Sequence, residues 1–324
     1  MKWGFVGAGS VGQTYAWFAH AGGAQVAFLV KPHHVQGLQG GLPQYLLNRS
    51  SARSRPERLV DYTLVTSARE LADWKPDVVF LCTSSDALRL PWVEELLHAL
   101  PDTCTVVTLA AGIHDADRIR GLAGASRTVV GLIALIAYHA PLPGEQVPEP
   151  GNAIWFPPFS ACPFDGPDAA LAPILATLRR GGMPVRQQSH LDQATGWPNA
   201  FLMPFLVGLE ASDWKFRTLL STAAARQVCL AVDETCGVVA TRVSTRRPLF
   251  TRILTPFTLR TILFAARFVV PIDLQTYLQV HFTKVGPQTR MFVDEYIDAA
   301  AAAGLPVTSL TGLRNRLPAA TPSR

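Results

Sequence analysis

The first half of the chain alternates continuous apolar runs with amphipathic stretches. Runs rich in β-branched residues predict strands at 2–6, 24–30, 77–82, 105–109 and 128–136. Apolar character that continues through every position is typical of strands covered on both faces, as in a parallel sheet. The pattern also predicts helices at 11–21, 87–99, 115–121 and 167–180, and a late strand at 152–156. Strands and helices in alternation indicate a doubly wound α/β domain.

After about residue 186 the pattern changes to long helical stretches. Helices are expected at 192–211, 213–236, 248–268 and 272–284, with a last one after Pro287 that stops at Gly304. In this last helix Val293, Tyr296 and Ala300 recur at i, i+3 and i+7, which makes one apolar face. We therefore predict an α/β plus all-α fold. A Rossmann-type doubly wound parallel sheet in residues 1–188 is followed by a helical domain in residues 189–324.

A glycine motif stands between the first predicted strand and the first predicted helix. In a GxGxxG sequence the first glycine permits a tight turn and the second lets the backbone approach a pyrophosphate. The third lets the helix pack on the strand. The free N–H groups at the start of the helix favour an anion there. We therefore expect dinucleotide binding, with a merely flexible turn as the alternative, by Gly7, Ala8, Gly9, Ser10, Val11 and Gly12.

Lys31 stands at the end of the second predicted strand. An acidic residue at this point would bind the ribose hydroxyls of NAD, whereas a cation offers a partner to a 2′-phosphate. We therefore predict NADP(H) rather than NAD(H) as the cofactor, with a solvated lysine as the alternative. His33 and His34 could assist with the phosphate, although loop histidines are more often simply exposed.

Composition excludes several classes of protein. Apolar residues make up 48% of the 324 residues and charged residues 16%, which excludes a disordered chain. The net charge of +5 comes from scattered basic residues. The densest basic cluster, 241–247, lacks the interleaved aromatic residues of a nucleic-acid surface. We expect a small-molecule substrate and no nucleic-acid partner.

Cysteine usage and hydropathy bear on the compartment. The five cysteines are odd in number and share no CxxC spacing, which argues against a disulfide framework or a metal site and suits a reducing compartment. A strand is expected directly after residue 1, so we expect no signal peptide and a cytoplasmic protein. The apolar stretch 249–282 is interrupted by arginines and prolines, and we expect no membrane span. A buried helical core is the first interpretation and a membrane-associated surface the second.

Seven segments carry a resemblance to a known family. In the N-terminal half they are GAGSVG at 7–12, the basic Lys31 after FLV, DVVFLCTSSDA at 77–87 and TVVTLAAGI at 105–113. In the C-terminal half they are GWPNAFLMP at 196–204, TYLQVHFTKVGPQ at 276–288 and DEYIDAAAAAGLPV at 294–307. Over nearly its full length the chain resembles the ketopantoate reductase (2-dehydropantoate 2-reductase) family. That family has a Rossmann domain and a helical domain with the active site between them, and it reduces a 2-oxo acid with NADPH.

The resemblance also implies roles for individual residues. The family's catalytic lysine corresponds to Thr195, so the chain resembles a divergent member that lacks this lysine. Asn199 and Thr276 correspond to substrate-binding residues of the family, and Gln288 to its glutamate. On the cofactor side the loop with Thr83 and Ser84 follows the strand at 77–82, with Ser84 in place of a lysine. Ala111 stands in place of an asparagine near the nicotinamide.

Without that lysine the proton must come from elsewhere. His281 and Lys284 are at i and i+3 and share a helical face, and histidine is a suitable proton donor near neutral pH. Either could instead be a surface residue. Thr195, Asn199, Thr276 and Gln288 could together form a neutral hydrogen-bonding pocket, which suits a less anionic carbonyl or an imine.

Two functional hypotheses follow. The first is an NADPH-dependent oxidoreductase that transfers hydride to a carbonyl or imine between the two domains, with a substrate other than ketopantoate. The second is a nucleotide-binding protein that kept the fold without redox turnover. The apolar stretch 249–270 could supply a homodimer surface in the helical domain.

Overall fold

The computed structural model describes residues 1–49, 55–109, 112–191, 196–247 and 249–318, apart from the side chains of residues 250 and 252. The chain divides into two compact units, Met1–Asp192 and Gln193–Arg324. The first is a parallel-dominated sheet with helices and the second is helical, so the predicted fold class is confirmed.

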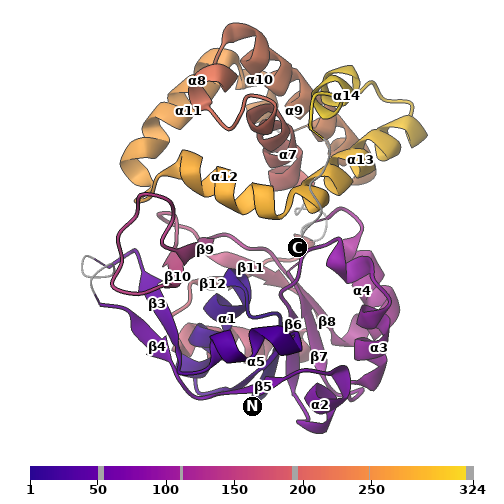
Figure 1. The fold of residues 1–324 in the computed structure, drawn as a ribbon. Coiled ribbons are helices and arrows are strands. Elements are labelled where there is room, and N and C mark those ends of the chain that lie inside the picture. Colours follow the sequence, from indigo (N-terminus) through magenta and orange to yellow (C-terminus); the bar gives the residue numbers. More distant parts are fainter. Residues whose placement is uncertain (50–54, 110–111, 192–195, 248, 319–324) are drawn as a thin grey trace. The chain divides into compact units, whose positions relative to one another are not determined.

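The main sheet of the N-terminal unit has eight strands in the order β12-β11-β8-β7-β6-β1-β2-β5 (Figure 1). Its neighbouring strands run parallel except for the antiparallel pair β8 and β11. In chain order the strands are β1 (Lys2–Val6), β2 (Gln25–Leu29), β5 (Tyr62–Val65), β6 (Val78–Leu81), β7 (Thr105–Thr108), β8 (Thr128–Gly131), β11 (Cys162–Asp165) and β12 (Val185–Gln187).

Helices cover both faces of this sheet. On one face lie α1 (Ser10–Ala21) and α5 (Asp168–Arg180), and on the other α2 (Ala68–Asp73), α3 (Trp92–Ala99) and α4 (Asp115–Ala123) (Figure 1). The α1 side holds an aromatic core, in which the Phe80 ring stacks on Trp3 at 5.3 Å and on Phe5 at 5.1 Å. Cover on both faces explains why the strands read as continuous apolar runs.

A second sheet was not expected from the sequence. It has the order β4-β3-β10-β9 and is made of β3 (Leu42–Leu46), β4 (Glu57–Leu59), β9 (Ile136–Ala140) and β10 (Gly151–Trp155). The late strand predicted at 152–156 therefore belongs to this sheet. The single strand predicted at 128–136 is wrong, because the chain leaves the main sheet after Gly131 and enters the second sheet at Ile136.

Proline accounts for a further difference in this unit. The helix predicted at 87–99 is instead a 3₁₀ turn (Ala87–Arg89) followed by α3. Pro91 is the residue before the first turn of α3. A proline has no N–H to continue a preceding helix and is favoured at a helix start.

The C-terminal unit consists of helices over its described residues (Figure 1). They are α7 (Gly196–Glu210), α8 (Phe216–Leu219), α9 (Thr222–Arg242), α10 (Phe250–Ile253), α11 (Pro256–Val269), α12 (Leu274–Lys284), α13 (Gly286–Ala302) and α14 (Thr308–Arg314). The helices predicted at 213–236 and 248–268 are each divided in two. The second division falls at Thr255, whose hydroxyl accepts from the N–H of Thr258 and so begins α11.

Close packing of α7 on α9 forms the centre of this unit. A Cβ at Gly208 of α7 would lie 2.3 Å from the Val228 side chain of α9, so only glycine permits this approach. The hydroxyl of Thr235 on α9 donates to the carbonyl of Ala200 on α7 at 2.5 Å. No helix in the described part of the chain is long and apolar enough to cross a membrane.

Candidate functional site

The loop between β1 and α1 has the geometry expected of the glycine motif. Gly7 has φ +97°, which favours glycine, and its N–H donates to the carbonyl of Leu29 on β2 at 2.9 Å. A Cβ at Gly12 would lie 2.1 Å from the carbonyl oxygen of Gly7, so the third glycine permits the helix to pack on the turn. Gly9 is exposed, and a Cβ there would meet nothing within 4 Å.

The start of α1 is open to an anion. Gly9 is the N-cap residue and offers no side-chain cap, and the first turn begins with Ser10 and Val11. The first N–H groups of a helix have no partner within the helix, and the helix dipole favours negative charge at this end. Open space at Gly9 and N–H groups in the first turn together give this helix start the features that suit a pyrophosphate.

This loop lies at the topological switch point of the sheet. β1 pairs with β2 on one side and with β6 on the other, so the connections from the two neighbours diverge at its carboxyl end. The β6 loop reaches the same place, because a Cβ at Gly7 would lie 3.5 Å from the Thr83 side chain. The hydroxyl of Thr83 is buried without a hydrogen-bond partner among the described residues. Ser84 is half-buried, and its carbonyl accepts from the N–H of Leu88 at 3.1 Å.

Lys31 lies at the same edge of the sheet, two residues after β2. It is exposed and precedes a 3₁₀ turn at Pro32–His34. The rings of His33 and His34 lie 4.1 Å apart, and both side chains are exposed. The loop therefore presents an ammonium and two imidazoles to solvent beyond the strand whose Leu29 carbonyl holds Gly7.

A buried carboxylate organises the loop after β7. Asp115 is 1% exposed, and its carboxylate accepts from the N–H of Gly112 at 2.7 Å and from Arg89 Nη2 at 3.3 Å. Arg118 donates to the carbonyl of Leu88 at 3.2 Å, which ties the β6 loop to α4. The sequence analysis placed a helix start at residue 115 but missed the hydrogen bonds that Asp115 makes to Arg89 and to the N–H of Gly112. Ala111, predicted to contact the cofactor, lies outside the described residues.

The candidate substrate residues belong to the helical unit. Asn199 is 6% exposed on α7. Thr276 lies in the first turn of α12, where its N–H donates to the carboxylate of Asp273 at 2.9 Å, and Gln288 is half-buried in the first turn of α13. Thr195 lies outside the described residues. Thr276 and His281 are five residues apart on one helix and so point about 140° apart, which places them on different faces of α12.

The environment of His281 argues against a proton-donor role. Its ring is half-buried and stacks on Tyr277 at 5.4 Å. Burial, with a smaller contribution from the charge of Lys284, lowers the pKa of His281 to about 4. The imidazole is therefore neutral at physiological pH, in contrast to the expectation from sequence. Lys284 shares its face on α12 and is exposed.

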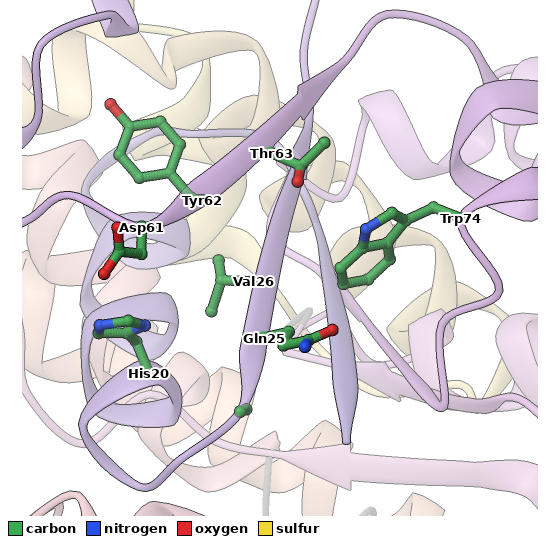
Figure 2. A pocket seen from close by; sticks show the side chains of 8 residues that line it. His20, Gln25, Val26, Asp61, Tyr62, Thr63 and Trp74 are labelled. Carbon is green, nitrogen blue, oxygen red and sulfur yellow. The ribbon is translucent and has the colours of Figure 1, made fainter.

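A surface pocket of about 290 Å³ lies away from the glycine loop. It is found at the amino ends of β2 and β5 and the far end of α1, between His20, Asp61 and Trp74 (Figure 2). Parallel sheets bind ligands at the carboxyl ends of their strands, so this pocket is not the expected nucleotide site. In the described part of the chain, no three His, Cys, Asp or Glu side chains gather as metal ligands.

Comparisons with known proteins agree with this geometry. The family model for ketopantoate reductase PanE/ApbA matches residues 3–160. No curated protein matched the chain in sequence.

Solved structures match over almost the whole chain. One is a PanE/ApbA family ketopantoate reductase from Ralstonia eutropha JMP134, with TM-score 0.75, 16% identity, and 97% of this chain and 96% of that one covered. Another is 2-dehydropantoate 2-reductase from Geobacter metallireducens GS-15, with TM-score 0.75, 16% identity, and 99% and 100% covered. D-mandelate dehydrogenase with NADH and anilino(oxo)acetate has TM-score 0.68, 15% identity, and 98% and 96% covered.

At these identities the solved structures establish the fold, and the family model adds a match in sequence over residues 3–160. The resemblance predicted from the sequence is thereby confirmed: residues 3–160 match the ketopantoate reductase (PanE/ApbA) family model, and the chain has the ketopantoate reductase fold.

Proposed function

We propose that the protein is an NADP(H)-dependent oxidoreductase that reduces a carbonyl group, in a 2-oxo acid or ketone, or an imine. The open anion site at Gly9 carries this proposal. A side chain at Gly12 would clash with the carbonyl of Gly7 and prevent this turn from forming. The space outside Gly9 is open, and we propose that a ligand fills it. The match of residues 3–160 to ketopantoate reductase supports an oxidoreductase with a nicotinamide cofactor.

The residues of the N-terminal unit fit a dinucleotide. Gly9, Ser10 and Val11 would hold the pyrophosphate with backbone N–H groups at the start of α1. The unpartnered hydroxyl of Thr83 beside Gly7 is available to the ligand. Ser84 and Ala111, in the loops after β6 and β7, are proposed to lie toward the nicotinamide.

Lys31 supports NADP(H) over NAD(H). Its exposed ammonium, with two imidazoles beside it, offers the charge that a 2′-phosphate requires. D-mandelate dehydrogenase, whose fold is similar, was solved with NADH. We propose that Lys31 decides the cofactor choice of this chain.

The proposed substrate is not ketopantoate. The resemblance implies that a threonine, Thr195, corresponds to the family's lysine, and Asn199, Thr276 and Gln288 are neutral. Neutral hydrogen-bonding groups can orient a carbonyl or imine, and orientation supplies much of the rate once a hydride donor is bound. When bound, the reduced nicotinamide supplies that hydride.

His281 and Lys284, the two candidate proton donors on α12, differ in their ability to supply a proton. With a pKa of about 4, His281 is a neutral imidazole at neutral pH. Its remaining N–H can donate a hydrogen bond but is not acidic enough to transfer a proton to the substrate. The ammonium of Lys284 lies on the same face, and we propose it as the proton source. Replacing Lys284 by Met should then lower turnover without changing NADPH affinity.

The second candidate function is nucleotide binding without redox turnover, which the loss of the family's lysine favours. NADPH titration by fluorescence and NADPH consumption over 2-oxo acids, ketones and cyclic imines separate the two. Binding with turnover on one substrate class supports the oxidoreductase. Binding without turnover on all three supports the second candidate, and no binding rejects both.

Two further features bear on assembly and compartment. α10 and α11 expose apolar side chains, including Ile253 at 63%, Phe257 at 75% and Phe268 at 71%. A contiguous exposed apolar surface usually marks an interaction site, and we propose a homodimer through it. All five cysteines are free, which supports a reducing compartment and a cytoplasmic location.

A further inference from the structure

A buried chain of side-chain amides connects the second sheet to the glycine loop. Gln44 on β3 is fully buried and Asn152 on β10 is 1% exposed, and the two are register partners across the parallel pair of strands. Gln13, on the first turns of α1, is 8% exposed and completes the chain. Buried polar groups are costly unless they are hydrogen-bonded, so three amides in one place require an explanation.

The hydrogen bonds of this chain run in one direction. Asn152 Nδ2 donates to Gln44 Oε1 at 2.9 Å, and Gln44 Nε2 donates to Gln13 Oε1 at 3.3 Å. Gln13 Nε2 then donates to the carbonyl of Ala8 in the glycine loop at 2.8 Å. Gln44 Nε2 also donates to the carbonyl of Leu42 at 3.2 Å. A backbone carbonyl only accepts, so the bonds to Leu42 and Ala8 fix which way the Gln44 and Gln13 amides face.

A second branch reaches the first residue of α1. Asn152 Nδ2 donates to the hydroxyl of Thr14 at 2.9 Å, and that hydroxyl donates to the carbonyl of Ser10 at 2.7 Å. The carbonyls of Ala8 and Ser10 therefore accept from Gln13 and Thr14 of α1, and these two side chains are linked to Asn152, through Gln44 or directly. If the Asn152 amide were flipped, its Oδ1 would face Gln44 Oε1, and two acceptors would be in contact. The orientation with Nδ2 toward Gln44 is therefore favoured.

Holding the Ala8 carbonyl has a consequence for the anion site. In a trans peptide the C=O of one residue and the N–H of the next point in opposite directions. With the Ala8 carbonyl turned inward to Gln13, the N–H of Gly9 points away from the amide chain. Gly9 is exposed and a Cβ there would meet nothing, so this is the open side of the loop.

We propose that Gln13 is a positioning residue for the pyrophosphate site, and that Gln44 and Asn152 of the second sheet hold its amide in the required orientation. The inference rests on the proposed function, because it assigns a role toward the dinucleotide. It also gives the second sheet a function: its strands β3 and β10 hold the cofactor loop in its anion-binding conformation.

The test uses a variant that keeps size and removes the donor, Gln13→Met. Two probes are titrated: NADPH, and adenosine 2′-phosphate, which lacks the pyrophosphate. We expect NADPH to bind about tenfold more weakly, a loss on the scale of one hydrogen-bonded site. Adenosine 2′-phosphate should bind within about twofold of wild type. Two results would overturn the proposal. One is an equal loss of affinity for both nucleotides, which indicates a general loss of structure, and the other is unchanged NADPH affinity.

A matched control is Thr128→Val. The Thr128 hydroxyl is buried and donates to the carbonyl of Gly124 at 2.7 Å, at the amino end of β8 and away from the glycine loop. It should lower stability without altering NADPH affinity.

If Gln13→Met does not fold, Gln44→Met tests the same proposal, because loss of the Gln44 amide allows the Gln13 amide to rotate. We expect a loss of NADPH affinity of about threefold there, and no loss contradicts the proposal. Failure of the wild-type protein to bind NADPH would instead reject the proposed function.

Discussion

Gly12 and Gly7 approach so closely that a Cβ on Gly12 would lie 2.1 Å from the carbonyl oxygen of Gly7. This contact is between the first turn of α1 and the turn that leaves β1, and it sets how near the helix comes to the sheet. Gly9, between them, has no such restriction. Gly7 and Gly12 are therefore required by the fold, whereas Gly9 is not, and we propose that Gly9 faces the ligand.

Replacing Gly9 by Ala should leave the fold intact and block the nucleotide. With φ −72° and ψ −178° the backbone suits alanine, and the added methyl group meets nothing in the protein. We expect an unchanged melting temperature and a loss of NADPH affinity of at least about tenfold. Gly12→Ala is the contrasting variant, and its clash should cost about 1–3 kcal/mol of stability. Unaltered NADPH binding by Gly9→Ala would place the ligand elsewhere.

Replacing Lys31 by Ala should reduce NADPH affinity selectively. The exposed ammonium can contact a 2′-phosphate, which NADH lacks, so NADH binding should change little. We expect a loss of about tenfold for NADPH, and a larger loss for Lys31→Glu because the carboxylate repels the phosphate. Lys215→Ala, an exposed lysine of the helical unit, is the control. Equal losses for both nucleotides would reject the assignment of Lys31.

The ring of His281 should titrate near pH 4 in an NMR pH titration of the folded protein. Its folded pKa, about 4, lies below its ordinary value of 6.5. The unfolded state therefore binds more protons between these values, so stability falls as pH falls from about 6.5 toward about 4. The stability is present in full above that window. His281→Phe, which keeps the ring stack on Tyr277, should remove this part of the acid sensitivity. A titration midpoint near pH 6.5 would contradict this prediction and would make His281 a candidate proton donor again.

Replacing Arg290 by Met should destabilise the helical unit strongly. Arg290 Nη2 lies 2.7 Å from Glu210 Oε1, with side chains 9% and 13% exposed, and it also donates to the carbonyl of Pro318 at 2.9 Å. Loss of one partner of a buried pair costs about 3–5 kcal/mol, measured by urea denaturation. Arg69→Met, in a pair with 91% and 76% exposed side chains, should cost less than about 0.5 kcal/mol. Similar costs for both variants would show that burial of the Arg290 pair does not matter.

A charge on α11 should separate the proposed dimer. Phe257, Phe264 and Phe268 recur at i, i+7 and i+11 and are exposed along the helix. We expect wild type to be dimeric in light scattering, and Phe257→Glu or Phe268→Glu to be monomeric at the same concentration. Leu90→Glu, an exposed apolar position of the N-terminal unit, should remain dimeric. A monomeric wild type would reject the dimer.

Local patterns allowed most of the main sheet and the glycine loop to be predicted. Strand, glycines and helix are contiguous over 2–21, so the motif contains its own structural context. The second sheet could not be predicted in this way, because Gln44 and Asn152, which pair across two of its strands, are more than a hundred residues apart in the sequence. The breaks before α3 and α11 carried a local signal in Pro91 and Pro256 that the apolar periodicity obscured.

The residues of the candidate site also differ in whether a local sequence pattern reveals them. Gly7, Gly9 and Gly12 could be identified because their roles depend on the backbone nearby. The pKa of His281 depends on burial, which no short sequence pattern reveals. Asp115 and Arg89 pair across 26 residues, and their importance becomes visible only when the β6 and β7 loops are side by side.

Calorimetric titration of the protein with NADPH and with NADH measures directly whether it binds a nicotinamide dinucleotide. We expect saturable binding of NADPH at one site per chain, with NADH binding more weakly. Absence of binding by either nucleotide at millimolar concentration would contradict it.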